Sequence, residues 1–352
     1  MTGSRKDQYW RTDLDENIAF FRGYRHCGDV QVSSFSLEEH VSIPESRSGV
    51  ARIELPTLGV AVAIYGGFLL LTWFYRDLPL WVTAPIGALL IAWHGSLQHE
   101  TIHHHPTPWR PVNSFIGAIP LALWLPYPLY RHQHLRHHGF GGRYLTDPLR
   151  DPESYYLPTG RLKLRGPMGR FVATANRSFA GRMILGPANT IGLFLGSEGR
   201  RLIAGDRPRL LIWLGHALGL AVVLGWVVGV CKIPFLVYVF CIVYPGTSLS
   251  LMRSFIEHRA NADPTLRTAV VEANPFWGVL FLYNNLHVVH HNLPDVPWYE
   301  LPTLWRNASA AEKERVASSG LLFRGGYLEI VSRFVLRPVI PIEHPDVKVP
   351  PG

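Results

Sequence analysis

The sequence predicts an all-α integral membrane protein, with four transmembrane helices in two hairpins and a cytoplasmic helical cap that carries histidine clusters. Three observations support this fold class. Only 17% of the 352 residues are charged and 47% are hydrophobic, whereas about 25% of a soluble chain is charged. Four apolar runs approach the ~20 residues with which a helix crosses a bilayer core. Eleven of the 17 histidines fall in three short groups beside these runs.

The chain begins with a polar stretch of mixed charge, residues 1–54, which we expect to be a cytoplasmic N-terminal arm without a secretory signal. The first two spans are expected at about 58–74 and 78–97, where the sequence is apolar and uncharged. The link between them, residues 75–77, is short enough only for a hairpin.

Prolines interrupt the next apolar run, 115–130, at positions 120, 126 and 128. Closely spaced prolines break helical hydrogen bonding, so this run predicts an interfacial or re-entrant segment. A long basic stretch, 131–209, follows. The third and fourth spans are expected at about 210–230 and 233–252, with only two residues between them, which predicts the second hairpin.

The membrane domain is expected at 55–340, followed by a C-terminal tail at 341–352. Apolar and basic residues alternate at 327–339, which predicts an amphipathic helix on the membrane surface. An even number of spans places both termini and the histidine clusters on one side. Nearly all Lys and Arg lie on that side, which the positive-inside rule makes cytoplasmic, and we expect a bacterial inner membrane. The net charge of +8 then reflects topology and does not indicate nucleic acid.

The three cysteines, Cys27, Cys231 and Cys241, are isolated, and no Cys-x-x-Cys occurs. A zinc ribbon, a rubredoxin-type iron site and a thioredoxin motif are therefore excluded. Composition also excludes collagen, coiled coil and disulfide-rich scaffolds. The histidines are thus the candidate metal ligands.

The histidines repeat two spacings that suit metal binding. The first group contains H-x-x-x-H, and the other two share H-x-x-H-H. Positions i, i+3 and i+4 lie on one face of a helix, so each triplet can aim three imidazoles at one point. One more histidine follows the fourth span. The nine candidate ligands are His99, His103, His134, His137, His138, His258, His287, His290 and His291.

Nine imidazoles exceed the three or four ligands that one zinc needs, and they suit two metals with four or five ligands each. Imidazole binds Zn, Cu, Fe and Ni, so the ligand type alone does not select the metal. His104 and His105 extend the first group. His104 is therefore an alternative to His103 as a ligand.

With these three histidine boxes in this order, the sequence resembles the integral-membrane fatty acid desaturase and hydroxylase superfamily, which includes alkane hydroxylases and carotenoid ketolases. The resemblance runs from about residue 55 to 340, and Glu257-His258 resembles a further histidine of that superfamily. It implies two non-haem irons, dioxygen as co-substrate and an external electron donor such as a ferredoxin with its reductase. Segments 145–153 and 291–298 look more like bacterial acyl-lipid desaturases and carotenoid ketolases than like acyl-CoA desaturases.

A histidine that binds a metal usually donates its other ring N–H to a carboxylate or carbonyl. Carboxylates near the boxes that could accept this hydrogen bond are Glu100, Asp147, Asp151, Glu257 and Asp295. Asp147 and Asp151 each precede a proline and could equally start turns. Asn284 and Asn285 could hold a water on iron or cap a helix. Aromatic residues that could line a lipid path, or form an interfacial belt, are Trp93, Trp124, Tyr127, Tyr130 and Trp298.

The leading hypothesis is a dioxygen-dependent di-iron oxidoreductase that introduces a double bond into a lipid acyl chain. Breaking an unactivated C–H bond needs an oxidant that no side chain provides. A hydroxylase or ketolase of a lipid, alkane or carotenoid is the close alternative, because the same metals serve both reactions. A zinc-dependent membrane hydrolase is more distant. A metal transporter would place ionisable residues inside the spans.

Overall fold

The structure is a computed structural model, and it describes residues 53–348 apart from the side chains of residues 140 and 141. The arm expected at 1–54 lies outside the described residues except for its last two. Within the described part the fold is mostly helical, with two short sheets of two parallel strands each and no closed sheet. The prediction of a mostly helical chain is confirmed, but the two short sheets show that the chain is not all-α.

Four helices in the described chain are long and apolar enough to cross a membrane. They are Leu55–Trp73 (α2), Leu80–Ile102 (α3), Arg207–Val230 and Phe235–Arg253. The third combines α8 (Arg207–Leu224) with a π-helical turn, η3 (Gly225–Val230), and the fourth combines α9 (Phe235–Val237), the π-helical η4 (Tyr238–Val243) and α10 (Tyr244–Arg253). Each overlaps one of the four spans that the apolar runs predict. Helix α3 continues five residues beyond the predicted end at Leu97, which brings His99 inside the helix.

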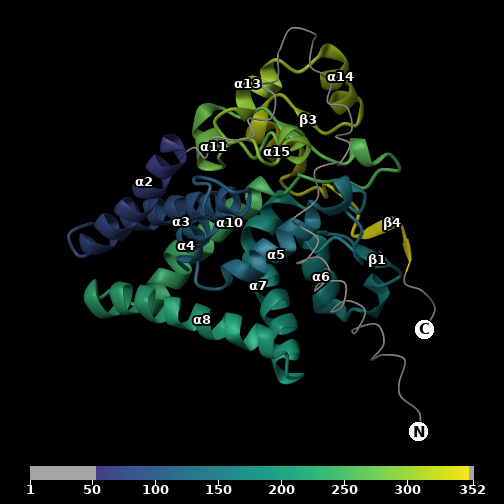
Figure 1. Cartoon of the computed structure of the whole chain (residues 1–352). Helices are drawn as coiled ribbons and strands as arrows, with labels where there is room; N and C mark the ends of the chain where they lie inside the picture. The colour runs from purple at the N-terminus through teal and green to yellow at the C-terminus, as the bar shows by residue number, and fades with distance from the viewer. Residues whose placement is uncertain (1–52, 349–352) are drawn as a thin grey trace. The chain divides into compact units, whose positions relative to one another are not determined.

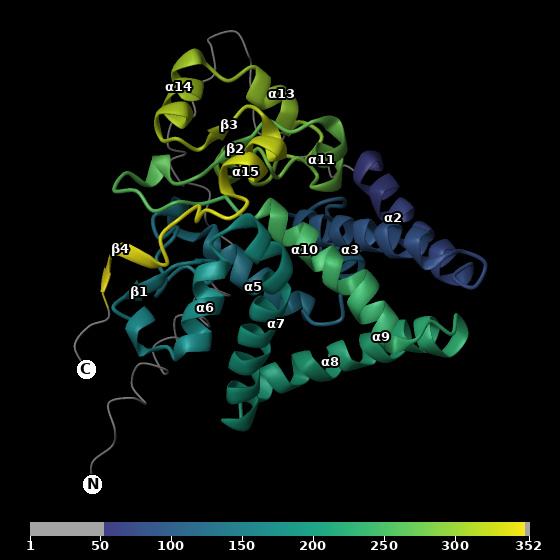
Figure 2. The same ribbon diagram turned by 180° about the vertical axis from the view of Figure 1, so that it is seen from behind.

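The four candidate spans differ in the helices that they contact. Helix α2 turns back on α3 and stays in contact with it (Figure 1). The third and fourth spans meet at residues 231–234. From this point α8 lies along the direction toward α7 (Phe179–Ile203), while α10 packs on α3 and α7 (Figure 2). The contact between α3 and α10 is close because small residues face it: a Cβ on Gly246 would lie 2.5 Å from Cβ of Ile91. Small residues at a crossing let helix backbones approach each other.

The proline-rich run is broken as expected. Helix α4 (Arg110–Ala118) ends four residues into it, residues 119–126 are not helical, and α5 (Tyr127–His137) begins near its end. Pro126 occupies the N-cap of α5 and Pro128 lies in its first turn, where a missing N–H costs nothing. The prolines thus set the position at which α5 begins, the helix whose last turn carries the second histidine box.

The basic stretch 131–209 holds two helices that the sequence did not predict, α6 (Pro167–Ala175) and α7. Helix α7 is 25 residues long, and the Ser178 side chain caps it by accepting a hydrogen bond from the Gly181 amide. Glycines and arginines interrupt its apolar pattern, so the hydrophobic periodicity did not predict this helix. Helix α7 packs against α10, the helix that His258 follows.

The remaining elements of the described chain are short, and most of them lie in its C-terminal half. Five helices are α11 (Pro275–Leu280), α12 (His287–Asn292), α13 (Leu301–Arg306), α14 (Ala310–Ser318) and α15 (Gly326–Phe334). Three 3₁₀ turns are η1 (Gly139–Gly142), η2 (Leu162–Leu164) and η5 (Pro264–Leu266). Strand β2 (Val270–Val271) pairs with β3 (Leu322–Phe323), and β1 (Leu157–Thr159) pairs with β4 (Glu343–Lys348). Helix α15 overlaps the predicted amphipathic segment 327–339 but ends at Phe334. The described part of the expected tail is not separate, because β4 belongs to a sheet.

We expect Gly246→Ala to lower the thermal unfolding temperature of the purified protein in detergent, because the added methyl group collides with Ile91 and with the Ala88 carbonyl. Overpacking of this kind costs roughly 1–3 kcal/mol. The control is Gly215→Ala in α8, where nothing lies within 4 Å of the new Cβ. An unchanged or raised unfolding temperature for Gly246→Ala would show that the two helices do not approach this closely.

Candidate metal centre

Nine histidines from three helices and one loop gather in two adjoining groups. The five-histidine group contains His99, His103, His134, His138 and His290. The four-histidine group contains His137, His258, His287 and His291. Within each group the facing nitrogen atoms lie within 4.8 Å of one another. The groups touch, since the His138 and His291 rings stack with centroids 4.2 Å apart. The structure thus brings together the nine histidines that the sequence analysis named as candidate ligands.

The second and third boxes each divide between the two groups. His134 and His138 belong to the five-histidine group, while His137 between them belongs to the other. The third box divides in the same way, with His290 separated from its two neighbours. A helix turns 100° per residue, so positions i and i+4 stay ~40° apart while i+3 points ~100° away from i+4. The expectation that each triplet converges on one point is therefore wrong.

Different elements position the histidines. His99 lies in the last turn of α3 and His103 is its C-cap. The second box ends α5, and the third box opens α12. His258 follows α10, and a bridge to Thr268 holds its backbone. The centre therefore assembles at the ends of two apolar helices, from segments far apart in the sequence.

The nitrogen spacings fit metal ions. Five pairs of Nε2 atoms, such as His134 with His103 and His290 with His138, lie 3.0–3.1 Å apart. Two nitrogens at this separation, each ~2.1 Å from one ion, subtend roughly 90–95°, whereas tetrahedral zinc requires about 109°. The separation is that of neighbouring donors around an ion with five or six ligands. A cation would also separate ring nitrogens that otherwise face one another.

Burial keeps most of these imidazoles neutral, as metal ligands must be. Burial lowers the pKa of His138, His258 and His290 well below the usual value, and neighbouring histidines lower it further. His137 differs. Burial acts to lower its pKa as well, but Glu153 and Asp151 outweigh that effect and raise it to about 9. Binding of a metal there must displace a proton.

Two carboxylates orient the second box from outside. Glu153 Oε1 lies 2.9 Å from His134 Nδ1, and Asp151 Oδ1 lies 2.8 Å from His137 Nδ1. Burial acts to raise the pKa of Glu153, but His134 and His137 outweigh it and hold the pKa well below its usual value. Each imidazole thus directs its other nitrogen at the group. Sequence reasoning named Asp151 and missed Glu153, although it noted the segment 145–153 that contains both.

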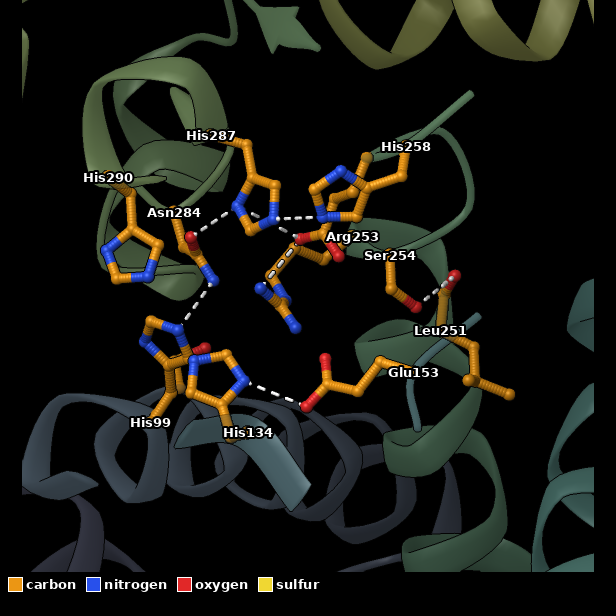
Figure 3. Close-up of polar contacts among 12 residues, drawn as sticks. His99, His134, Glu153, Leu251, Arg253, Ser254, His258, Asn284, His287 and His290 are labelled. Atoms are coloured by element: carbon orange, nitrogen blue, oxygen red, sulfur yellow. Dashed lines mark hydrogen bonds and ion pairs between the residues drawn. The ribbon is translucent and has the colours of Figure 1, made fainter. Parts of the chain in front are cut away.

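Asn284 lies between the two groups (Figure 3). Its Oδ1 accepts a hydrogen bond from His287 Nδ1 at 2.8 Å, and its Nδ2 lies 3.3 Å from His99 Nε2. One amide therefore links a histidine of each group. Asn285 plays a different part, since its side chain donates to the Val271 carbonyl at 2.7 Å.

Two more of the expected carboxylates touch the histidines at longer range. Glu257 Oε1 lies 3.7 Å from His287 Nδ1 and forms an ion pair with Arg253 at 2.7 Å. Glu100 Oε1 lies 3.5 Å from His99 Nδ1, and its other oxygen accepts a hydrogen bond from the Trp298 amide. Arg253 was not predicted from the sequence, although it lies one helical turn before Glu257.

Three other candidates lie away from the groups. Asp147 accepts a hydrogen bond from the Leu149 amide at 2.8 Å, which is a turn contact. Asp295 is exposed, and among the described residues no hydrogen bond or ion pair joins it to a grouped histidine. His104 is exposed and has a positive φ of 70°, which turns it away from both groups. These three expectations are not supported.

A cavity of about 530 Å³ adjoins the four-histidine group. Glu153, Glu257 and His258 line it on the metal side. Residues from α3, α7, α10 and the proline-rich segment line its apolar part, which includes Ile91, Leu123, Trp124, Leu193, Phe194 and Leu251. Trp124 and Tyr130 are in its wall, whereas Trp93, Tyr127 and Trp298 are not. An apolar chain could thus extend from the histidines into the span region.

Comparison with known proteins supports one family. The model of the family described as fatty acid desaturase matches residues 76–319, which is more than half of the chain and includes all nine grouped histidines. The chain matched none of the curated proteins with which it was compared.

We expect Glu153→Gln to weaken metal retention, because the amide orients His134 less strongly than the carboxylate does. Loss of such a partner typically lowers metal affinity about 10- to 100-fold. The measurement is metal content after dialysis against graded chelator. Asp147→Asn is the matched control, because that carboxylate contacts a turn amide. Equal retention by both variants would contradict the orienting role.

His103 and His104 can be separated by experiment. His103→Asn should lower the metal content of the purified protein, because it removes one donor from the five-histidine group. His104→Asn should retain the metal, and asparagine tolerates the positive φ at this position. The reverse result would make His104 the ligand.

Proposed function

Because the chain belongs to the fatty acid desaturase family, we propose that it is a membrane-bound, non-haem di-iron desaturase that uses dioxygen to introduce a double bond into a lipid acyl chain. Membership in this family, together with four apolar helices, makes the protein a membrane enzyme of lipid oxidation. The finer reaction is our proposal. The observation that carries it is that His258 of the four-histidine group lines a cavity with an apolar part among the spans.

In this proposal each histidine group holds one iron. The five-histidine group offers five donors and the four-histidine group offers four. When bound, the irons would supply the dioxygen-activating chemistry that oxidises an unactivated C–H bond. Asp151 and Glu153 hold two of the imidazoles in the orientation that faces the ions.

The protein's own part is positioning and exclusion of water. The apolar wall of the cavity would hold the acyl chain extended, with the reacting carbons beside His258. Trp124 and Tyr130 would contact the chain, because both line the cavity. A closed apolar environment also keeps water from competing with the substrate. Arg253 neutralises Glu257 beside His287, so that this buried carboxylate is not left unpaired.

Two features weigh against a zinc hydrolase. Nine facing imidazoles are more than one zinc uses, and the near-right-angle spacing of their nitrogens does not suit a tetrahedral ion. A single catalytic zinc would leave at least five of these buried imidazoles without a partner.

We also propose the arrangement in the membrane. The two span pairs form hairpins, and both termini and the histidine groups lie on the cytoplasmic side, where nearly all Lys and Arg occur. The N-terminal arm and the C-terminal segment lie on the same side. An electron donor such as a ferredoxin would approach the basic 131–209 stretch, because opposite charge steers association.

The test is expression in a bacterial host with simple lipids, followed by mass analysis of the fatty acids. The expected product has lost two hydrogen atoms, whereas a product that has gained one oxygen atom would make the enzyme a hydroxylase. His137→Ala and His290→Ala should each abolish the product, since they remove one donor from each group. Turnover that survives both substitutions would overturn the site.

Metal analysis of the purified enzyme separates the remaining alternative. Two irons per chain are expected from two histidine groups. One zinc per chain, with no change in the host lipids, would support a hydrolase instead.

A further inference from the structure

Two buried arginines line the same cavity on the side of α6 and α7. Arg177 is 5% exposed and Arg182 is 2% exposed, and both contribute to the cavity wall. In the described part of the chain neither guanidinium lies within ion-pair distance of a carboxylate, unlike Arg209, Arg253 and Arg315. Two buried cations thus face the cavity with no described carboxylate within ion-pair distance of either.

Their existing hydrogen bonds are all to neutral groups. Arg177 Nη2 donates to the backbone oxygens of Tyr155 and Ile342, while its Nε is buried without a partner. Arg182 Nε donates to the Asn176 carbonyl at 3.1 Å, and its guanidinium lies 4.0 Å from the centre of the Tyr155 ring. These contacts fix the orientation of both side chains, but they leave the charge uncompensated.

Both side chains remain cations near neutral pH. Burial, together with the neighbouring Arg182, lowers the pKa of Arg177 only to about 10. A buried charge without a partner is strongly unfavourable, so an anion that enters the cavity would relieve a cost that the fold already carries. The guanidinium fork matches the oxygens of carboxylate and phosphate groups.

We propose that Arg177 and Arg182 bind the anionic head group, a carboxylate or a phosphate, of the lipid whose acyl chain occupies the apolar part of this cavity. The identification of this lipid as the substrate rests on the proposed function, whereas the binding of the anion does not. Uncharged esters, alkanes and carotenoids would be poor ligands at this end of the cavity.

One short segment connects the head-group site with the metal centre. Glu153 contacts His134, and two residues later Tyr155 contacts Arg182. Tyr155 is also held by a hydrogen bond of 2.9 Å between its hydroxyl and Ser254, just beyond α10. A head group fixed by the arginines would therefore sit at a set distance from the histidines. This arrangement would select which carbons of the chain reach the irons.

The test measures binding rather than turnover. Purified holoenzyme in detergent would be titrated with palmitic acid, methyl palmitate and dipalmitoyl phosphatidic acid, and binding would be quantified by native mass spectrometry. At least one anionic lipid should bind about 10-fold or more tightly than the methyl ester, since charged hydrogen bonds carry that difference. Tighter binding of the acid identifies a carboxylate head, and tighter binding of phosphatidic acid identifies a phosphate head.

Variants assign the effect to the two arginines. Arg182→Gln should weaken binding of the preferred anion roughly 10- to 100-fold and leave the ester within about 2-fold. Arg177→Gln should do the same, and the wild-type comparison stands if that variant does not fold. Arg170→Gln is the control, because Arg170 is exposed on α6 and is not in the cavity wall.

Equal affinity of the wild-type protein for the ester and both anions would overturn the inference. An equal loss for ester and anion in the variants would overturn it as well. The proposed function fails separately: a protein that binds the anion but alters no host fatty acid retains the head-group site and loses the assigned reaction.

Discussion

Close packing of α3 against α10 is the contact on which the candidate metal centre depends. Gly246 lets the two helices meet at Ile91. His99 and His103 at the end of α3 belong to the five-histidine group, which adjoins the four-histidine group that contains His258 beyond α10. The other grouped histidines come from the ends of α5 and α12, which have 11 and 6 residues. Helices this short are not stable alone, so the packed spans must hold them in place.

A second constraint is that every buried imidazole has two ring nitrogens to satisfy. In His134 and His137, one nitrogen faces the histidine group and the other meets a carboxylate. Asn284 serves His287 in the same way and also reaches His99. These outer partners fix the direction of each ring, which is why the facing nitrogens have the spacing of metal donors. Removal of one of these carboxylates or of the Asn284 amide would change the orientation of an imidazole without replacing a grouped histidine.

The cavity extends from the four-histidine group into the region of the spans. Its metal side is formed by residues that orient or belong to the histidine groups, and its apolar part runs among α3, α7 and α10. The two unpaired arginines lie in the same wall. In the head-group site that we propose, the two arginines would set the position of a lipid with an anionic head.

The sequence by itself determined the four apolar spans, the nine histidines and the family, because hydrophobic length and helical spacing are local properties. The match of residues 76–319 to the family confirms that resemblance. Only the tertiary structure decided how the boxes divide between the two groups, since the division depends on which way each ring faces. It also revealed Glu153, the bridging amide of Asn284, helix α7 and the buried arginine pair. Their roles arise from contacts between distant segments, such as His137 with His258, which no local pattern encodes.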